Sequence, residues 1–297
     1  MKCINEQCQK EIGEMVFCPY CGTKQERSII YCGYCGAEMD RDALFCSNCG
    51  KESFFARTEN DKQQDGPFFI DPDGTCSYNH ADSSTGARLT IPETIDGTRV
   101  TRIGSFLGCR FQEIIIPDSV LGIDGSAFAD CSFLKKITIP NSVATIESCA
   151  FSGCSALKRI ALPLYLEAIE DYTFYACSAL EEIVVPHEVH YIGQCAFSQC
   201  KSLKRLTLPD SLNVIGLSAF SGCDLLQRVV IPGAVSQIEF GAFMSCTALT
   251  EVVIEGPTII DSCAFSSCPK LKRVFIKDRN ALINGVAFDY GVEISYI

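Results

Sequence analysis

The sequence predicts a β-rich solenoid of 23-residue repeats, a parallel sheet plus turns, preceded by two small cysteine-rich modules. A cysteine recurs mostly every 23 residues, and each of these cysteines lies three residues after a phenylalanine. A short apolar segment, usually ended by proline, recurs at the same interval. Four further cysteine pairs crowd into the first 50 residues. The eight repeating cysteines, here the cysteine column, are Cys109, Cys131, Cys154, Cys177, Cys200, Cys223, Cys246 and Cys268.

Residues 1–52 contain two copies of one cysteine pattern. The segments 17–22 (FCPYCG) and 45–50 (FCSNCG) match at an offset of 28 residues, which indicates two consecutive four-cysteine sites. Four thiolates at such spacing favour zinc, and four protein ligands leave no open position, so both sites are expected to be structural. Pairing between the two middle cysteine pairs stays open as an alternative. The expected ligands are Cys3, Cys8, Cys18 and Cys21 for the first zinc, and Cys32, Cys35, Cys46 and Cys49 for the second.

These residues resemble tandem zinc ribbons of the double-zinc-ribbon type. The first pair departs from that pattern, with four residues between Cys3 and Cys8 where the family usually has two. A module of this size has little apolar core, so metal binding is expected to supply most of its folding free energy. The polar segment 53–67 follows without periodicity and is predicted to be a flexible linker.

The segment 68–297 is predicted to form the solenoid. Residues 68–88 are expected to cap it, and 277–297 to form a degenerate closing turn, because Phe288 continues the phenylalanine column without a cysteine. The clearest repeat, 137–157, opens with a strand in which side chains alternate inward and outward, and a second short apolar pair follows. The predicted strands are Leu89–Ile91, Ile114–Ile116, Ile137–Ile139, Ile160–Leu162, Ile183–Val185, Leu206–Leu208, Val229–Ile231, Val252–Ile254 and Val274–Ile276.

The repeat is similar to the leucine-rich repeats of the BspA-like class, whose unit reads roughly IxIPxxVxxIGxxAFxxCxxLxx. The resemblance covers 68–297 and implies parallel-stacked turns; members of that class are often surface or adhesive proteins. The column cysteines are expected to be small, reduced, buried apolar residues. Three further cysteines, Cys149, Cys195 and Cys263, are expected to be optional core or turn residues.

Two columns of side chains should face outward from the predicted strands. One alternates basic, acidic, basic: Arg88, Glu113, Lys136, Arg159, Glu182, Arg205, Arg228, Glu251 and Arg273. The other, an apolar strip, runs Thr90, Ile115, Thr138, Ala161, Val184, Thr207, Val230, Val253 and Phe275. Charge neutralisation and strand propensity alone explain both columns, and a protein-binding face is the alternative. The partner-binding candidates are Val184, Thr207, Val230, Val253, Phe275, Arg159, Arg205 and Arg228. On the opposite, turn-bearing side the candidates are Tyr165, Tyr172, Tyr191 and Phe240.

Composition argues against catalysis and nucleic-acid binding. The chain has three histidines, no phosphate-binding glycine loop and a net charge of −11. Residues 1–52 hold six Lys/Arg against eight Asp/Glu, which disfavours a nucleic-acid-associated regulator. The sequence therefore predicts a non-enzymatic protein-interaction module, with the zinc modules as a second docking element. A surface or adhesion protein is the other alternative.

The expected location is the cytoplasm. No apolar leader follows Met1, and no apolar run is long enough to span a membrane. Twenty cysteines without a disulfide-type arrangement favour a reducing compartment. Exposure at the surface by a non-classical route stays open.

Overall fold

The computed structural model describes residues 29–31, 38–40, 68–78 and 88–297. The chain divides into two compact units, Met1–Gln64 and Asp65–Ile297. In the first unit, β1 (Ile29–Tyr31) pairs antiparallel with β2 (Glu38–Asp40). The rest of the described structure belongs to the second unit.

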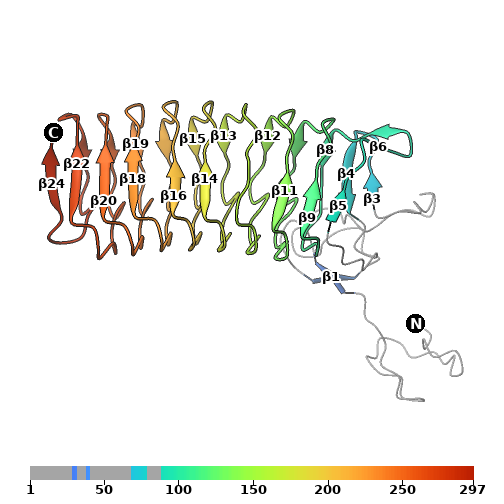
Figure 1. Ribbon diagram of the computed structural model, residues 1–297, viewed down its shortest axis with the longest axis horizontal. Coiled ribbons are helices and arrows are strands. Elements are labelled where there is room, and N and C mark those ends of the chain that lie inside the picture. Colours follow the sequence, from blue (N-terminus) through green and yellow to red (C-terminus); the bar gives the residue numbers. More distant parts are fainter. Residues whose placement is uncertain (1–28, 32–37, 41–67, 79–87) are drawn as a thin grey trace, which may run out of the picture. The chain divides into compact units, whose positions relative to one another are not determined.

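The second unit is a solenoid whose turns stack in parallel (Figure 1). One side carries a row of strands, here the first row, in which each strand pairs in register with its equivalent one repeat away. Glu113, for example, lies opposite Arg88 on one side and Lys136 on the other. The first row consists of β5 (Arg88–Thr90), β9 (Glu113–Ile115), β11 (Lys136–Thr138), β14 (Glu182–Val184), β16 (Arg205–Thr207), β18 (Arg228–Ile231), β20 (Glu251–Ile254), β22 (Arg273–Ile276) and β24 (Glu293–Tyr296).

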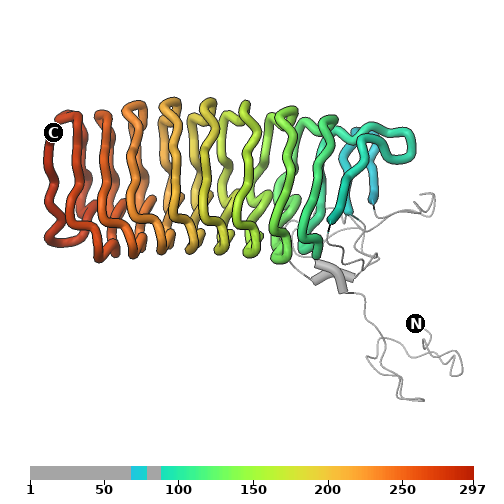
Figure 2. Tube along the Cα trace, in the orientation of Figure 1, coloured from blue at the N-terminus to red at the C-terminus, as the bar shows by residue number. Residues whose placement is uncertain are grey.

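A second row of shorter strands runs along the other side of the same turns (Figure 1), whose stacking the Cα trace follows in Figure 2. It begins with the hairpin of β3 (Phe68–Ile70) and β4 (Thr75–Tyr78), and β4 pairs in parallel with β8 (Arg102–Ile103). A small hairpin, β6 (Thr94–Ile95) and β7 (Thr98–Arg99), projects beside it. The row continues with β10 (Gly122–Ile123), β12 (Thr145–Ile146), β13 (Ala168–Ile169), β15 (Tyr191–Ile192), β17 (Val214–Ile215), β19 (Gln237–Ile238), β21 (Ile259–Ile260) and β23 (Leu282–Ile283).

The phenylalanine column forms the centre of the core. Successive rings lie 5.0–5.5 Å apart between centroids, and most are stacked with nearly parallel planes. Phe288 stacks on Phe265 at 5.2 Å and forms a parallel bridge with it, so the last turn keeps the column although it lacks the cysteine. At the other end Tyr78, from the hairpin, packs on Phe106 and Phe111. Each ring thus buries its faces against the next turn.

The chain reverses direction beside this column through left-handed turns. From Phe128 to Phe265, the residue two positions before each column phenylalanine has a φ between 52° and 65°. L-residues rarely adopt this conformation, because their Cβ approaches the following carbonyl. Cys149, Cys195 and Cys263 occupy this position and are half-buried. They are therefore turn residues, which is one of the two roles that the sequence predicts for them. The position is filled by Ser126, Cys149, Tyr172, Cys195, Ser218, Gly241 and Cys263.

The predicted strand Ile160–Leu162 does not form. In Figure 1 the turn between β11 and β14 has no arrow in the first row. The second row is interrupted at the same place, because β12 ends one sheet and β13 begins the next. This turn has alanine at the outward position of both rows, Ala161 and Ala168. Alanine lacks the branched side chain that favours strands and packs across a ladder. The boundary between 137–157 and 160–180 is here named the rung junction.

Candidate functional site

The outward charged column of the first row is held together by ion pairs between neighbouring turns. Glu113 lies 2.9 Å from the Lys136 ammonium and 3.9 Å from the Arg88 guanidinium. Glu182 and Arg205 approach to 2.6 Å. The hydrogen bond from Lys136 lowers the pKa of Glu113, and that from Arg205 lowers the pKa of Glu182. The glutamates of this column are therefore paired with cations of neighbouring turns, and the cations are exposed to solvent.

The order of charges also divides the first row. Two cations follow each other without an intervening acid at Lys136 and Arg159, and again at Arg205 and Arg228. The strand ladder is interrupted at both places, since β11 and β16 each end a sheet. Like charges directly opposite each other on neighbouring strands are destabilising. The glutamates thus relieve repulsion within each sheet, as expected, and repulsion remains at the two boundaries.

The apolar strip is less accessible than the sequence predicts. Val184 is 57% exposed and Thr207 is exposed, whereas Val230 and Phe275 are half-buried. Val253, a partner-binding candidate, is only 9% exposed, so the expectation that it faces solvent is wrong. Its in-register neighbours are Val230 and the large Phe275, which take most of the space beside it. The Arg273 guanidinium lies 5.9 Å from the centre of the Phe275 ring.

Exposed aromatic side chains lie along the second row. Tyr165 is 63% and Phe240 48% exposed, and Tyr191 lies in β15. Tyr172 is half-buried, and its hydroxyl accepts a hydrogen bond of 2.8 Å from the Gln194 amide. The partner-binding candidates of both rows therefore include accessible side chains. Neither set comes together into a closed site in the described residues.

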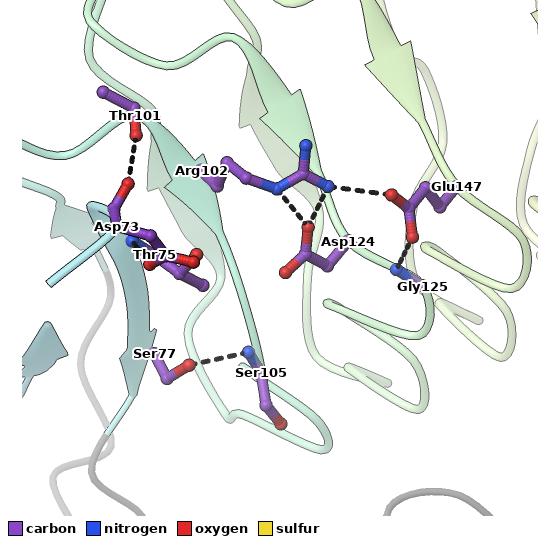
Figure 3. A network of polar contacts seen from close by, with 9 residues as sticks. All are labelled: Asp73, Thr75, Ser77, Thr101, Arg102, Ser105, Asp124, Gly125 and Glu147. Carbon is purple, nitrogen blue, oxygen red and sulfur yellow. Dashed lines mark hydrogen bonds and ion pairs between the residues drawn. The ribbon is translucent and has the colours of Figure 1, made fainter. Parts of the chain in front are cut away.

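Sequence reasoning missed a polar network on the second row (Figure 3). The Arg102 guanidinium donates to Asp124, with its Nε 2.8 Å from Oδ1, and to Glu147 at 2.8 Å. Glu147 also accepts the Gly125 backbone N–H at 3.1 Å. Burial raises the pKa of Asp124 against the opposing effect of the arginine. The recoverable signal was the acid that recurs directly after the second-row isoleucine, as in Asp124, Glu147, Glu170, Glu239 and Asp261.

The column thiols are buried and hydrogen-bonded. From Cys131 onward, each Sγ donates to the backbone carbonyl of the column phenylalanine one turn earlier, at 3.1–3.4 Å. Burial raises the pKa of Cys177 to about 12 and that of Cys200 well above its usual value. A nucleophilic or redox-active thiol needs a low pKa and access to solvent. The prediction of buried structural cysteines is confirmed.

The predicted zinc ligands, Cys3, Cys8, Cys18, Cys21, Cys32, Cys35, Cys46 and Cys49, lie outside the described residues. Among the residues that are described, no group of three or more His, Cys, Asp or Glu side chains is arranged to hold a metal ion. His187 lies 3.2 Å from Glu188, and His190 Nδ1 lies 3.0 Å from the Ser211 carbonyl oxygen. The described part of the chain also contains no helix with the length and apolar character needed to span a bilayer.

Comparison with solved structures finds similar solenoids in 17 chains. A leucine-rich repeat protein from Eubacterium ventriosum has a TM-score of 0.50 and 19% identity, over 75% of this chain and 92% of that one. The leucine-rich repeat protein of T. pallidum has a TM-score of 0.46 and 27% identity, over 69% and 86%. One from Bacteroides ovatus has 0.42 and 25%, over 76% and 79%. At 19% identity and a TM-score of 0.50, the likeness to the Eubacterium ventriosum protein concerns the fold alone.

The comparison with curated proteins finds no match. The family model described as "BspA type Leucine rich repeat region (6 copies)" matches residues 99–195 and 167–295. Together these ranges cover most of the solenoid, including the phenylalanine column and most of the in-register strands. The chain belongs to the BspA-type leucine-rich repeat family.

Proposed function

We propose that this protein is a non-enzymatic protein-recognition module whose first row supplies the binding face. A leucine-rich repeat solenoid is in general a protein-interaction or surface-recognition fold. The observation that carries the proposal is the exposed Val184, 57% accessible, beside the ion-paired Glu182 and Arg205. An apolar patch bordered by charge is the usual anatomy of a protein interface.

Apolar and charged groups have different roles in this proposal. Desolvated apolar contacts at Val184 and Val230 supply affinity. The charged residues around them, such as Arg159, Arg205 and Arg228, fix orientation and association rate, because rim charges stay solvated. Phe275 extends the strip toward the last turns. Val253 is buried beside its neighbours and does not contact a partner in this proposal.

The N-terminal module, 1–52, is proposed as a second docking element that holds two structural zinc ions and is joined through a flexible linker at 53–67. The duplicated cysteine pattern supports this, and so does the antiparallel pairing of β1 with β2, since Cys32 and Cys35 lie between those strands in the sequence. Metal analysis of the reduced full chain should give two zinc ions. A result of zero removes the proposal, and a result of one removes the irregular site of Cys3 and Cys8.

The proposed location is the cytoplasm, with a surface or adhesive role as the second candidate, which the resemblance to BspA-like proteins favours. Localisation of a tagged chain by cell fractionation, with protease applied to intact cells, separates the two. Cleavage of the tag in intact cells would contradict the cytoplasmic proposal. The third candidate, nucleic-acid association, is disfavoured by the net charge of −11.

Capture of partners from source-cell lysate by the full chain tests the recognition face. Val184→Asp with Val230→Asp should abolish capture of protein partners, with or without nuclease, because charge in the apolar patch cannot be desolvated. Arg205→Glu should weaken capture modestly and in a salt-dependent way. The matched control is Tyr191→Ser on the second row. If the double variant keeps its thermal stability and still captures every partner, the first row is not the recognition face.

A further inference from the structure

The backbone ladder of the second row is open at the rung junction. In the neighbouring turns the same positions are bonded: Ala144 N–H donates to Leu121 at 2.9 Å, and Glu147 N–H donates to Ile123 at 3.0 Å. One turn after the junction, His190 donates to Glu167 at 2.9 Å. At the junction itself, the equivalent donors are the N–H groups of Glu167 and Glu170.

Within the described structure, these two N–H groups make no backbone hydrogen bond. In the other turns, the equivalent N–H groups donate to carbonyls that correspond here to those of Ala144 and Ile146. These two carbonyls accept no backbone hydrogen bond across the junction. One wall of the junction therefore presents free acceptors and the other presents free donors. Backbone groups of this kind are strong hydrogen-bonding partners that folded proteins normally satisfy.

A cleft lies at this opening. Its volume is about 580 Å³, within the usual range for ligand sites, and Ala144, Ile146, Glu167 and Glu170 all line it. Tyr165, which is 63% exposed, lies on the same wall as the two glutamates. The free backbone groups and the cleft thus coincide.

The charge of the cleft is negative. Glu147, Glu167 and Glu170 line it. Glu147 is held by Arg102 and Gly125, but the carboxylates of Glu167 and Glu170 have no ion pair or side-chain hydrogen bond among the described residues. No lysine or arginine is among the lining residues. A ligand with positive charge would be complementary to this wall.

On the side of the phenylalanine column, here the turn side, contacts across the junction hold the two turns together and keep the cleft open. Across the same junction Cys149 N–H donates to the Asp171 carbonyl at 2.9 Å, and the rings of Phe151 and Phe174 stack at 5.5 Å. This is the widest spacing between successive rings of the column. The two turns are joined on one side and open on the other, so the cleft exists before any ligand binds.

We propose that the cleft at the rung junction binds an extended peptide segment bearing lysine or arginine side chains. The peptide backbone would donate to the carbonyls of Ala144 and Ile146 or accept from the N–H groups of Glu167 and Glu170. This is the chemistry of strand addition, in which main-chain hydrogen bonds give affinity and side-chain pockets give specificity. Alternate side chains of an extended peptide point to one face, so its cations can meet the glutamates. The site lies on the second row and does not depend on the first-row recognition face.

Fluorescence anisotropy with the full chain tests the proposal directly. The probe is a fluorescein-labelled hexapeptide of alternating lysine and valine, in about 0.15 M salt, where long-range attraction is screened. Two control peptides accompany it: the same sequence with alternate backbone amides N-methylated, and one with glutamate in place of lysine. Binding of the lysine peptide with loss for both controls is the expected result. No binding at 1 mM probe, or equal binding of the N-methylated peptide, would overturn the proposal.

Protein variants locate the site. Glu167→Gln with Glu170→Gln should weaken binding about 3- to 10-fold, as expected for two partly solvated charge contacts. The matched control is Glu239→Gln, because Glu239 occupies the position of Glu170 in a turn whose N–H is bonded, to Ile215 at 2.9 Å. An equal loss in the control would show general charge attraction and refute the site. Val184→Asp should leave peptide binding unchanged, so that failure of this site and failure of the first-row face are distinguishable.

Hydrogen exchange gives a second readout that does not rest on charge. In the free protein the amides of Glu167 and Glu170 should exchange faster than those of His190 and Gly193, which are bonded across the next turn. The lysine peptide should slow exchange at Glu167 and Glu170. Unchanged exchange at saturating peptide would contradict backbone pairing.

Discussion

The two sides of the solenoid differ in continuity. On the turn side the phenylalanine column runs through every described turn from Phe106 to Phe288, with ring spacings of 5.0–5.5 Å. On the strand sides the ladders are interrupted, and at the rung junction both rows open together. Side-chain stacking and backbone pairing are therefore separable in this fold. One residue type per turn maintains the stack, whereas a ladder needs compatible neighbours on both strands.

Removing a ring at the junction should have the largest effect. Phe151→Ala should lower the free energy of unfolding by about 3–5 kcal/mol, from lost apolar burial and the cavity left behind. Because the second-row ladder is open at the junction and the stack is one of the contacts that remain there, urea unfolding of this variant should separate into two transitions. Phe220→Ala, in a turn with a closed second-row ladder, should cost a similar amount and keep one transition. A single transition in both variants would show that the ladders do not divide the solenoid.

Alkaline pH should destabilise the solenoid through the buried thiols in the middle of the cysteine column. Burial raises the folded-state pKa of Cys177 to about 12 and raises those of Cys200 and Cys223 as well. The unfolded thiols ionise near pH 8.5, so their contribution is complete below that pH and is lost as pH rises toward the folded pKa. One pH unit above 8.5, each thiol should contribute a loss of about 1.4 kcal/mol.

Urea denaturation under reducing conditions at pH 8, 9 and 10 measures this loss. Cys177→Ala should be less stable at pH 8 and should have a shallower dependence on pH by about one thiol's contribution. The same slope in the variant and the parent would contradict the assignment of these thiols to the buried, unionised core.

Closing the junction is a smaller perturbation of opposite sign. Ala161→Thr with Ala168→Thr gives this turn the threonines that the preceding turn has at Thr138 and Thr145, and should raise the free energy of unfolding by up to about 1 kcal/mol. The matched variant, Thr138→Ala with Thr145→Ala, should lower it and accelerate amide exchange in the preceding turn. If the first variant leaves exchange at Glu167 and Glu170 unchanged, alanine is not the cause of the opening.

The smallest expected effect concerns the charged column at acid pH. The pKa of Glu182 is lowered by Arg205, so the contribution of this pair is present above the unfolded glutamate pKa, about 4.3, and is lost as pH falls through the folded value. Glu182→Gln should remove this part of the acid dependence of the melting temperature. An identical acid profile in the variant would show that the pair is neutral to stability.

Much of the fold was predictable because the repeat carries its own register. Once Phe151 and Cys154 are aligned with their equivalents, the strands, the buried column and the ion pairs of Glu113 follow. The opening at the junction was not predictable from the pattern, since Ile160 and Leu162 fit the repeat. Ala161 and Ala168 replace threonines of the preceding turn, but a single residue type does not reveal whether a ladder closes.

The site residues were predictable to a different extent. The inward–outward alternation of the strands placed Val184 correctly on the surface. It could not show that Val253 is only 9% exposed, because this burial depends on the size of its neighbours, Val230 and Phe275, in the two adjoining turns. The Arg102 network joins residues from three successive turns at two repeat positions, so no single column contains it. The cleft at the junction combines backbone groups with carboxylates, and backbone groups leave no trace in a sequence.

The charge order of the first row has a consequence for how such a protein can grow or shrink. Its unit is not one turn but three, because basic, acidic and basic residues recur in that order and the two like-charged contacts, Lys136 with Arg159 and Arg205 with Arg228, separate the units. Each ion pair joins neighbouring turns only, so duplication or deletion of a single glutamate-bearing turn would place two acids or two cations next to each other at that point. Gain or loss of a whole three-turn unit would keep each glutamate between two cations. Three turns are therefore the natural step for engineering longer or shorter versions of the solenoid.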